Sequence, residues 1–186
     1  MTRFVGTLAV AIGLLLAPLG ASPVPKEKPK PKDGPNSNEL LKKHKEALKY
    51  GASSAWGGWP ADKAFDGNPE TAWFSATNDC KSTKQDPYVE VTFAEDVAVS
   101  RVTVLGNREP SWPTGYFSWA GRLELLDKDG KVLVRVKKDA AGEKKDYDFA
   151  LAEPFGRVRT VRFISTDDDS AHGGNTCVAI SEIQVE

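Results

Sequence analysis

The chain has 186 residues and a formal net charge of −1, a size that allows one domain of ordinary dimensions with a full hydrophobic core. The charge is uneven: residues 1–50 carry nine Lys or Arg against four Asp or Glu, and residues 51–186 carry sixteen against twenty-two. The larger part is therefore acidic, which argues against nucleic acid as a partner.

Residues 1–22 have the pattern of a secretory signal peptide. An apolar run from Leu8 to Ala17 follows a positively charged start, and Pro18 and small residues come next. We expect cleavage after Ala21 or Ser22, and hence a secreted protein, extracellular or periplasmic, with no transmembrane anchor after cleavage. The alternative is an uncleaved anchor helix, against which the short, interrupted apolar run argues.

Two further segments precede the main domain. Residues 23–37 alternate Pro and Lys, which predicts an extended linker that buries no apolar area. Residues 38–50 predict a short amphipathic helix, with Ser37 or Asn38 as its cap. His44 shares the apolar face of this helix, so we expect it to pack or to be solvated rather than to bind a ligand.

Residues 51–186 show the period of β-strands. The run Tyr88–Phe93 alternates apolar and polar residues, and Asp127–Gly130 is a hairpin signal between two further runs. Seven or eight short strands without helical crossovers predict an antiparallel sandwich or barrel. In the last strand the alternation slips at Ser181–Glu182, which predicts a β-bulge that turns a carbonyl and the Glu182 side chain outward.

Two motifs at the ends of this region resemble a known family. "DGNPETAW" at 66–73 and "SEIQV" at 181–185 are similar to the opening and closing signatures of the coagulation-factor type C or discoidin family, the galactose-binding-like jelly rolls. The ending "TCVAISEIQV" and the loop "GNREP" also resemble a bacterial variant, the glycan-binding domain of NAD-glycohydrolase-type secreted proteins. The resemblance covers roughly Tyr50 to Glu186. It implies an all-β, antiparallel jelly-roll β-sandwich over residues 51–186.

The same resemblance implies a structural calcium site between residues 63–71 and the last strand. Calcium takes six to eight hard oxygen ligands, and carbonyls, hydroxyls and carboxylates are all present here. The alternative is a metal-free loop in which Asp66 accepts backbone N–H groups. The resemblance also implies that Trp73 and Phe65 belong to the core. The implied ligands are Lys63, Asp66, Asn68, Thr71, Ser181 and Glu182.

The two cysteines, Cys80 and Cys177, lie 97 residues apart, which matches no zinc motif. In an oxidising compartment an even pair predicts a disulfide. The alternative is two buried free thiols.

Three long, irregular loops are expected to meet at one end of the sandwich: Ala76–Pro87, Gly106–Ala120 and Thr166–Thr176. Sugars are bound by aromatic faces together with planar amide and guanidinium donors, and these loops contain both. The candidate ligand-binding residues are Asn107, Arg108, Trp112, Tyr116, His172 and Asn175.

The remaining aromatic and acidic residues of these loops have less specific roles. We expect Trp112 to be exposed and Trp119 to be in the core, whereas Trp56 and Trp59 form a second candidate platform. The run Asp167–Asp169 is typical of a solvated turn, with a second cation site as the alternative.

These features favour a secreted, non-catalytic glycan-binding module with a structural Ca²⁺, whose partner is a glycan or a cell-surface polysaccharide. The first alternative is a protein–protein adhesion or assembly domain on the same fold. The second is a small glycoside hydrolase, which would need two facing carboxylates or an acid beside His172. An enzyme is disfavoured because His172 is the only histidine of residues 51–186 and no nucleophile-elbow motif occurs.

Overall fold

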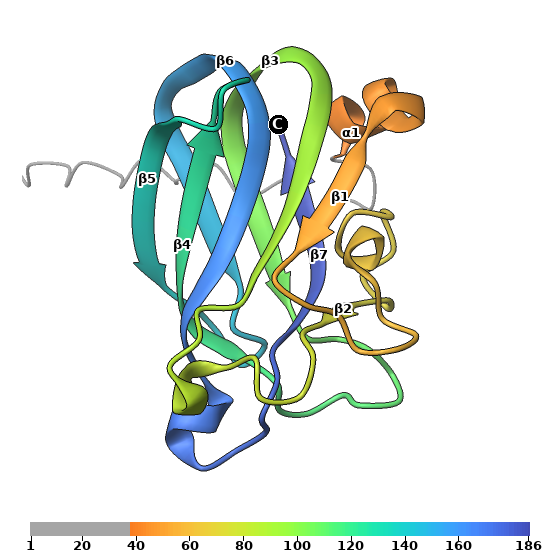
Figure 1. The fold of residues 1–186 in the computed structure, drawn as a ribbon, viewed down its shortest axis with the longest axis vertical. Helices are drawn as coiled ribbons and strands as arrows, with labels where there is room; N and C mark the ends of the chain where they lie inside the picture. Colours follow the sequence, from red (N-terminus) through yellow and green to blue (C-terminus); the bar gives the residue numbers. More distant parts are fainter. Residues whose placement is uncertain (1–37) are drawn as a thin grey trace, which may run out of the picture. The chain divides into compact units, whose positions relative to one another are not determined.

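The computed structural model describes residues 38–186, so the expected signal peptide (1–22) and linker (23–37) lie outside the described residues. The described part is an antiparallel β-sandwich with a few short helical turns, which confirms the predicted all-β jelly roll (Figure 1). The strands are β1 (Lys49–Ala52), β2 (Trp73–Phe74), β3 (Tyr88–Gly106), β4 (Ser118–Leu126), β5 (Val132–Asp139), β6 (Tyr147–Asp168) and β7 (Ala179–Val185). The helical elements are α1 (Glu39–His44), η1 (Lys45–Ala47), η2 (Ala61–Ala64), η3 (Lys81–Thr83) and η4 (Asp169–His172).

Strands β3 and β6 are long and take part in both layers of the sandwich. The first half of β3, residues 88–92, pairs with β1 and β6, and its second half, residues 102–106, pairs with β7. Register shifts between the two halves let the strand bend from one layer into the other. In β3, and likewise in β6, two of the short strands predicted from the sequence form one continuous strand.

The predicted bulge in the last strand is present. Leu105 pairs with Glu182 and Gly106 pairs with Ile180, so Ser181 is left without a partner across the ladder. The Glu182 side chain is 1% exposed and points into the domain rather than into solvent.

The N-terminal helix is shorter than the predicted 38–50, because β1 already begins at Lys49. Asn38 occupies the N-cap position but makes no side-chain cap bond. Its amide nitrogen donates to Glu182 Oε1 at 2.6 Å, and its Oδ1 accepts from the backbone N–H of Val185 at 2.9 Å. His44 packs edge-on against Phe93 with ring centroids 5.7 Å apart, in line with its predicted packing role.

The core and the hairpin follow the prediction. Trp73 and Phe65 are buried, and the turn Asp127–Gly130 connects β4 to β5 with Gly130 at φ 78°. Among residues 38–186, no helix combines the length and apolar character needed to cross a bilayer.

The predicted disulfide is absent: Cys80 and Cys177 are both free and buried. The Cys80 thiol faces the hydroxyls of Ser82, at 3.3 Å, and Thr83, at 3.8 Å. Burial, followed by the charge of Cys80, raises the pKa of Cys177 to about 12, so its thiol stays protonated at neutral pH. The alternative of two buried thiols therefore describes this structure.

Candidate functional site

The three long loops meet at one end of the sandwich, as the sequence predicts (Figure 1). The backbone N–H of Asn78 in the first loop donates to the Thr176 carbonyl in the third at 2.8 Å. The backbone N–H of Asp169 in the third loop donates to the Phe117 carbonyl in the middle loop at 3.0 Å. We call this end of the molecule the loop end.

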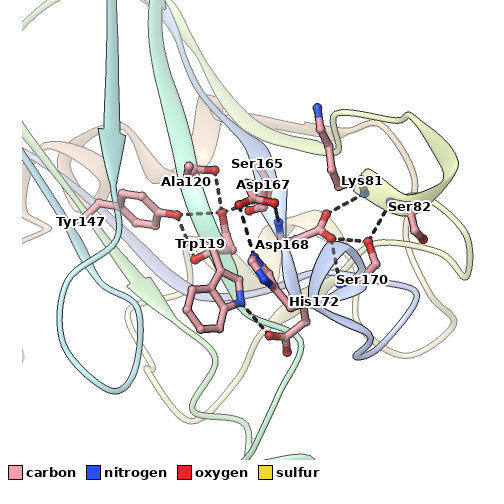
Figure 2. Close-up of polar contacts among 12 residues, drawn as sticks. Lys81, Ser82, Trp119, Ala120, Tyr147, Ser165, Asp167, Asp168, Ser170 and His172 are labelled. Atoms are coloured by element: carbon pink, nitrogen blue, oxygen red, sulfur yellow. Dashed lines mark hydrogen bonds and ion pairs between the residues drawn. The ribbon is translucent and has the colours of Figure 1, made fainter.

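The aspartate run holds this end together, so the prediction of a solvated turn is wrong for two of its members. Asp168 is 1% exposed, and its Oδ2 accepts from the backbone N–H of Lys81 in the first loop at 2.8 Å (Figure 2). Asp169 is 9% exposed and accepts from the Phe117 backbone N–H at 3.1 Å and from Trp119 Nε1 at 2.8 Å. A buried carboxylate needs such donors, and these come from two different loops.

Beside these loops lies a pocket with a cavity volume of about 260 Å³. In this pocket the candidate platform of Trp56 and Trp59 meets the candidate residues Trp112 and Tyr116 of the middle loop. Its lining, which we call the aromatic cup, consists of Trp56, Trp59, Phe74, Trp112 and Tyr116.

The rings of the cup follow one another around an arc. Neighbouring ring centroids are 5.3–6.3 Å apart, and neighbouring ring planes are inclined at 57–79°. Phe74 is 2% exposed and forms the floor, whereas Trp56 and Trp112, at 45% and 49% exposed, form the rim. Aromatic neighbours inclined to one another in this way stabilise each other's positions.

The floor of the cup follows from strand alternation in β2. Trp73 points into the main core, so Phe74 must point to the opposite side. There it packs in a second apolar cluster with Cys177 and Ala179, against which Tyr116 also lies. The signal for this floor was the "WF" pair itself, because one of two adjacent strand residues always faces away from the core.

Tyr116 is held in the cup by an unusual backbone. Its φ is 61°, directly after Gly115 at φ 82°, and its carbonyl accepts from the Ala179 N–H at 2.8 Å. A side chain at Gly115 would also collide with Asn175, whose Nδ2 lies 2.4 Å from the added Cβ position. A left-handed non-glycine residue costs about 1–3 kcal/mol and occurs often at ligand sites.

Two of the predicted ligand-binding residues make contacts that shape the middle loop. Asn107 is fully buried and donates to the carbonyls of Trp112, at 2.6 Å, and Gly115, at 3.1 Å. Arg108 binds both carboxylate oxygens of Asp146, at 2.8 and 2.6 Å. Nothing in the sequence pattern pointed to Asp146 as this partner.

The two candidate residues of the third loop lie outside the cup, and the prediction that Trp119 is in the core is wrong. His172 does not line the cup; its ring lies 4.7 Å from that of Trp119, and its Nε2 lies 3.4 Å from Asp167 Oδ2 (Figure 2). Asn175 lies beside the middle loop and is not part of the lining either. Trp119 is 36% exposed, not core, because its indole N–H reaches Asp169 and Lys145 Nζ lies 3.9 Å from a ring centroid.

The predicted calcium ligands gather where residues 63–71 meet β7. Thr71 Oγ1 lies 2.9 Å from both carboxylate oxygens of Asp66 and 3.5 Å from the Lys63 carbonyl. Glu182 accepts from the backbone N–H of Gly67 at 3.1 Å as well as from Asn38. Burial first, and the charge of Asp66 second, raise the pKa of Glu182 to about 8. Two carboxylates are thus close enough to repel each other.

The side chains of the remaining predicted ligands also make hydrogen bonds, although for Ser181 the expected ligand is the backbone carbonyl. Asn68 Oδ1 accepts from the Glu70 N–H at 3.1 Å, and Ser181 Oγ accepts from the Arg108 N–H at 2.7 Å. Asp66 Oδ1 accepts from the Asn68 N–H at 2.9 Å, as the metal-free alternative expects. Residues 38–186 contain no group of three or more His, Cys, Asp or Glu arranged to hold a metal, so any ion here would depend on neutral oxygens.

Comparison with known proteins adds a family. The sequence model of the F5/8 type C domain matches residues 49–183. No curated protein matches the chain.

Several solved structures share the fold at low sequence identity. The family 32 CBM from C. perfringens NanJ in complex with galactose superposes with a TM-score of 0.62 at 15% identity, covering 76% of this chain and 95% of that one. CpGH89CBM32-5 from Clostridium perfringens, in complex with GalNAc-β-1,3-galactose, gives 0.59 at 10% identity, covering 76% and 96%. A fucose binding module of Streptococcus pneumoniae gives 0.56 at 12% identity, covering 74% and 92%. At these identities the likeness concerns the fold alone.

Proposed function

The chain belongs to the F5/8 type C domain family, and on this premise we propose that it is a non-catalytic glycan-binding module with its ligand site in the aromatic cup. The observation that carries the proposal is the cup itself, a hollow at the loop end lined by five aromatic side chains. Aromatic faces pack against the C–H faces of sugars, and recessed apolar sites with a few polar groups are the usual form of ligand pockets.

Three further features support a ligand site here. The strained backbone at Tyr116 aims its ring into the hollow. Within residues 38–186, the indole N–H groups of Trp56, Trp59 and Trp112 make no hydrogen bond, so they are available as donors. The similar solved structures include proteins in complex with galactose and with GalNAc-β-1,3-galactose.

The test is a glycan array probed with the full chain and with Trp112→Ala. We expect the wild-type chain to bind a subset of glycans and Trp112→Ala to lose that binding, because it removes one side of the rim. Phe155→Ala is the matched control, since Phe155 is also an exposed aromatic but does not line the cup. A blank array from a folded protein would contradict the proposal and favour the protein-binding alternative.

A hydrolase is the weaker alternative. His172 and Asp167 lie 3.4 Å apart, but on the surface and outside the cup. Asp66 and Glu182 are neighbouring carboxylates, but Glu182 is buried, so a sugar substrate cannot reach it. We therefore assign neither pair a catalytic role.

We also propose a structural Ca²⁺ between residues 63–71 and β7. A buried carboxylate beside a second one is a costly arrangement that a cation would relieve. The Asp66 and Glu182 carboxylates, the Thr71 hydroxyl and the Lys63 carbonyl supply the hard oxygens that calcium prefers. Secretion through residues 1–22 remains part of the proposal, because such a module would meet its glycan outside the cell.

A further inference from the structure

A row of charged side chains crosses strands β3, β6, β4 and β5, which lie side by side in the sheet (Figure 1). Its members pair directly across neighbouring strands, in the order Glu90, Arg162, Glu124 and Arg135. The main core contains the residues that follow the first three of them in the chain, Val91, Phe163 and Leu125. Strand alternation therefore places the charged row on the outer face of the sheet.

The two arginines of this row use only part of their hydrogen-bonding capacity within the protein. Arg162 Nε donates to Glu90 Oε2 at 2.6 Å, and Arg135 Nε donates to Glu124 Oε1 at 2.8 Å. Arg101, by contrast, places two nitrogens on one carboxylate. Within residues 38–186 the terminal nitrogens of the two row arginines donate no hydrogen bond, so they are available to a partner.

Two further cations lie beside the row on β4 and β5. Arg122 is two residues before Glu124, and Lys137 pairs directly opposite Arg122. Arg122 Nε lies 3.1 Å from Glu124 Oε1 without the geometry of a hydrogen bond, and Lys137 is exposed. Four cations thus share two carboxylates, in a region that is acidic as a whole. We call these cations the basic face: Arg122, Arg135, Lys137 and Arg162.

The guanidinium groups of the basic face are held in place before any partner arrives. Glu124 is buried, and its Oε1 is near both Arg122 and Arg135. Arg162 Cζ lies 4.8 Å from the ring centroid of Tyr88, so an aromatic face and a carboxylate both fix this side chain. A guanidinium fixed in this way loses little conformational freedom when its outer nitrogens bind an anion.

The spacing of the cations indicates what kind of partner fits. Neighbouring strands are about 4.8 Å apart, so Arg162 and Arg135, two strands apart, are separated by about 10 Å at the backbone. Double-stranded DNA carries a charge about every 1.7 Å, which this spacing matches poorly. Proteins that lie on a membrane insert apolar side chains beside their cations, but among residues 38–186 no exposed large apolar side chain belongs to this face. A polysaccharide with an anionic group on every sugar unit, or on every second one, suits the wider spacing.

We propose that the basic face binds an acidic polysaccharide, whose sulfate or carboxylate groups accept from the outer nitrogens of Arg122, Arg135 and Arg162. Guanidinium forks bind such oxyanions with two parallel hydrogen bonds. The basic face shares no residue with the aromatic cup, so this inference does not depend on the ligand proposed for the cup.

Calorimetric titration of the full chain with heparin tests the proposal. We expect binding that weakens as salt is added, and no binding of uncharged dextran. The double variant Arg135→Gln/Lys137→Gln should bind heparin about tenfold more weakly, because it removes two charge-assisted contacts at exposed positions. Lys128→Gln/Lys131→Gln is the matched control, since it removes the same charge from the β4–β5 turn, and it should bind heparin as the wild type does.

The wild-type chain supplies a second measurement that does not depend on how the variants fold. Bound heparin should slow the modification of Arg135 by phenylglyoxal, as mass spectrometry of peptides measures it. Arg157, an exposed arginine near the middle of β6, should be modified at an unchanged rate.

Several results would overturn the inference. One is equal heparin affinity in the two double variants, which would assign binding to the lysines of residues 1–50, unchanged in both. Others are an unprotected Arg135, or tighter binding of phosphatidylglycerol vesicles or single-stranded DNA than of heparin. Trp112→Ala should leave heparin binding intact, so failure of the cup proposal and failure of this one are distinguishable.

Discussion

At the loop end, three consecutive aspartates do three different things. Asp167 lies beside His172 at the surface, Asp168 accepts from the backbone of the first loop, and Asp169 accepts from the middle loop. Successive residues differ so much because each side chain leaves the backbone in a different direction and meets a different loop. Asp169 is a positioning residue for the cup, since it binds the N–H of Phe117, the residue after Tyr116.

Asp169→Asn should loosen the middle loop. The amide removes the charge that strengthens two hydrogen bonds, so we expect a loss of about 1–3 kcal/mol in the free energy of unfolding. Glycan binding should weaken as well, and titration calorimetry with thermal denaturation measures both. Asp129→Asn, in the exposed β4–β5 turn, is the matched control and should change neither. Unchanged binding in Asp169→Asn would show that Tyr116 is positioned without this contact.

The thiols make a second residue-scale prediction. Both thiols are buried, and burial raises the pKa of Cys177 to about 12, so we expect almost no reaction of Cys177 with DTNB in the native protein at neutral pH. Against the effect of burial, hydrogen bonds with Ser170, Ser82 and Thr83 lower the pKa of Cys80, so any slow reaction of the native protein should occur at Cys80 first. After unfolding without a reductant, both thiols should react. If neither cysteine of the unfolded chain reacts with DTNB, the two cysteines form a disulfide.

At the scale of elements, β7 connects more of the molecule than its seven residues suggest. It pairs with β2 on one side and β3 on the other, and its bulge at Ser181 turns Glu182 toward the backbone N–H of Gly67. The segment before α1 reaches the same strand through Asn38. The helix is therefore fixed to the domain by one buried amide and by Leu41, which joins the main core.

Asn38→Ala should release this helix. The change leaves the Val185 N–H and Glu182 without their partner, so we expect a loss of about 1–3 kcal/mol in stability. Hydrogen exchange should accelerate at Val185. Lys43→Ala, on the exposed side of α1, should leave both quantities unchanged. If Asn38→Ala exchanges no faster at Val185 than wild type, the helix is held by its apolar contacts alone.

At the scale of the whole molecule, the beginning and the end of the domain meet at Glu182. The loop around Gly67, the segment before α1 and the last strand all contribute to this junction. Bringing segments so far apart in sequence together costs chain entropy that the contacts must offset, so the state of this junction should affect global stability.

Removal of calcium tests that dependence. If the site binds Ca²⁺, an excess of about a hundredfold over Kd should add about 2.7 kcal/mol, or roughly 5–10 °C in Tm, and EDTA should reverse it. Without calcium, Glu182 in the folded protein keeps a proton that the unfolded chain loses, since burial raises its pKa from 4.5 to about 8. The free energy of unfolding should therefore fall as the pH rises from about 4.5 to about 8.

Denaturation curves at several pH values, with calcium and with EDTA, separate these effects. Saturating calcium should remove the fall, because the ion replaces the proton, and Glu182→Gln should remove both the fall and the calcium response. Identical curves with calcium and with EDTA would contradict the metal site and leave the hydrogen-bonded loop as its description.

Much of the fold was predictable because its signals are local. Alternation along Tyr88–Phe93, the Asp127–Gly130 turn and the slip at Ser181 each depend on a few neighbouring residues, and each structure formed as expected. The site was less predictable because its polar partners are distant. Arg108 was expected to face a ligand, but Asp146 comes from another part of the chain and neutralises it.

The β class, the family with its two end motifs, and the abundance of aromatic residues in the long loops can all be read from the sequence. These follow from the period of side-chain direction in a strand and from short motifs. The folded chain was needed to show that Trp56, Phe74 and Trp112 share one hollow, that Trp119 does not, and that both thiols remain free. A side chain's neighbours depend on how distant strands pack, and no local pattern records that packing.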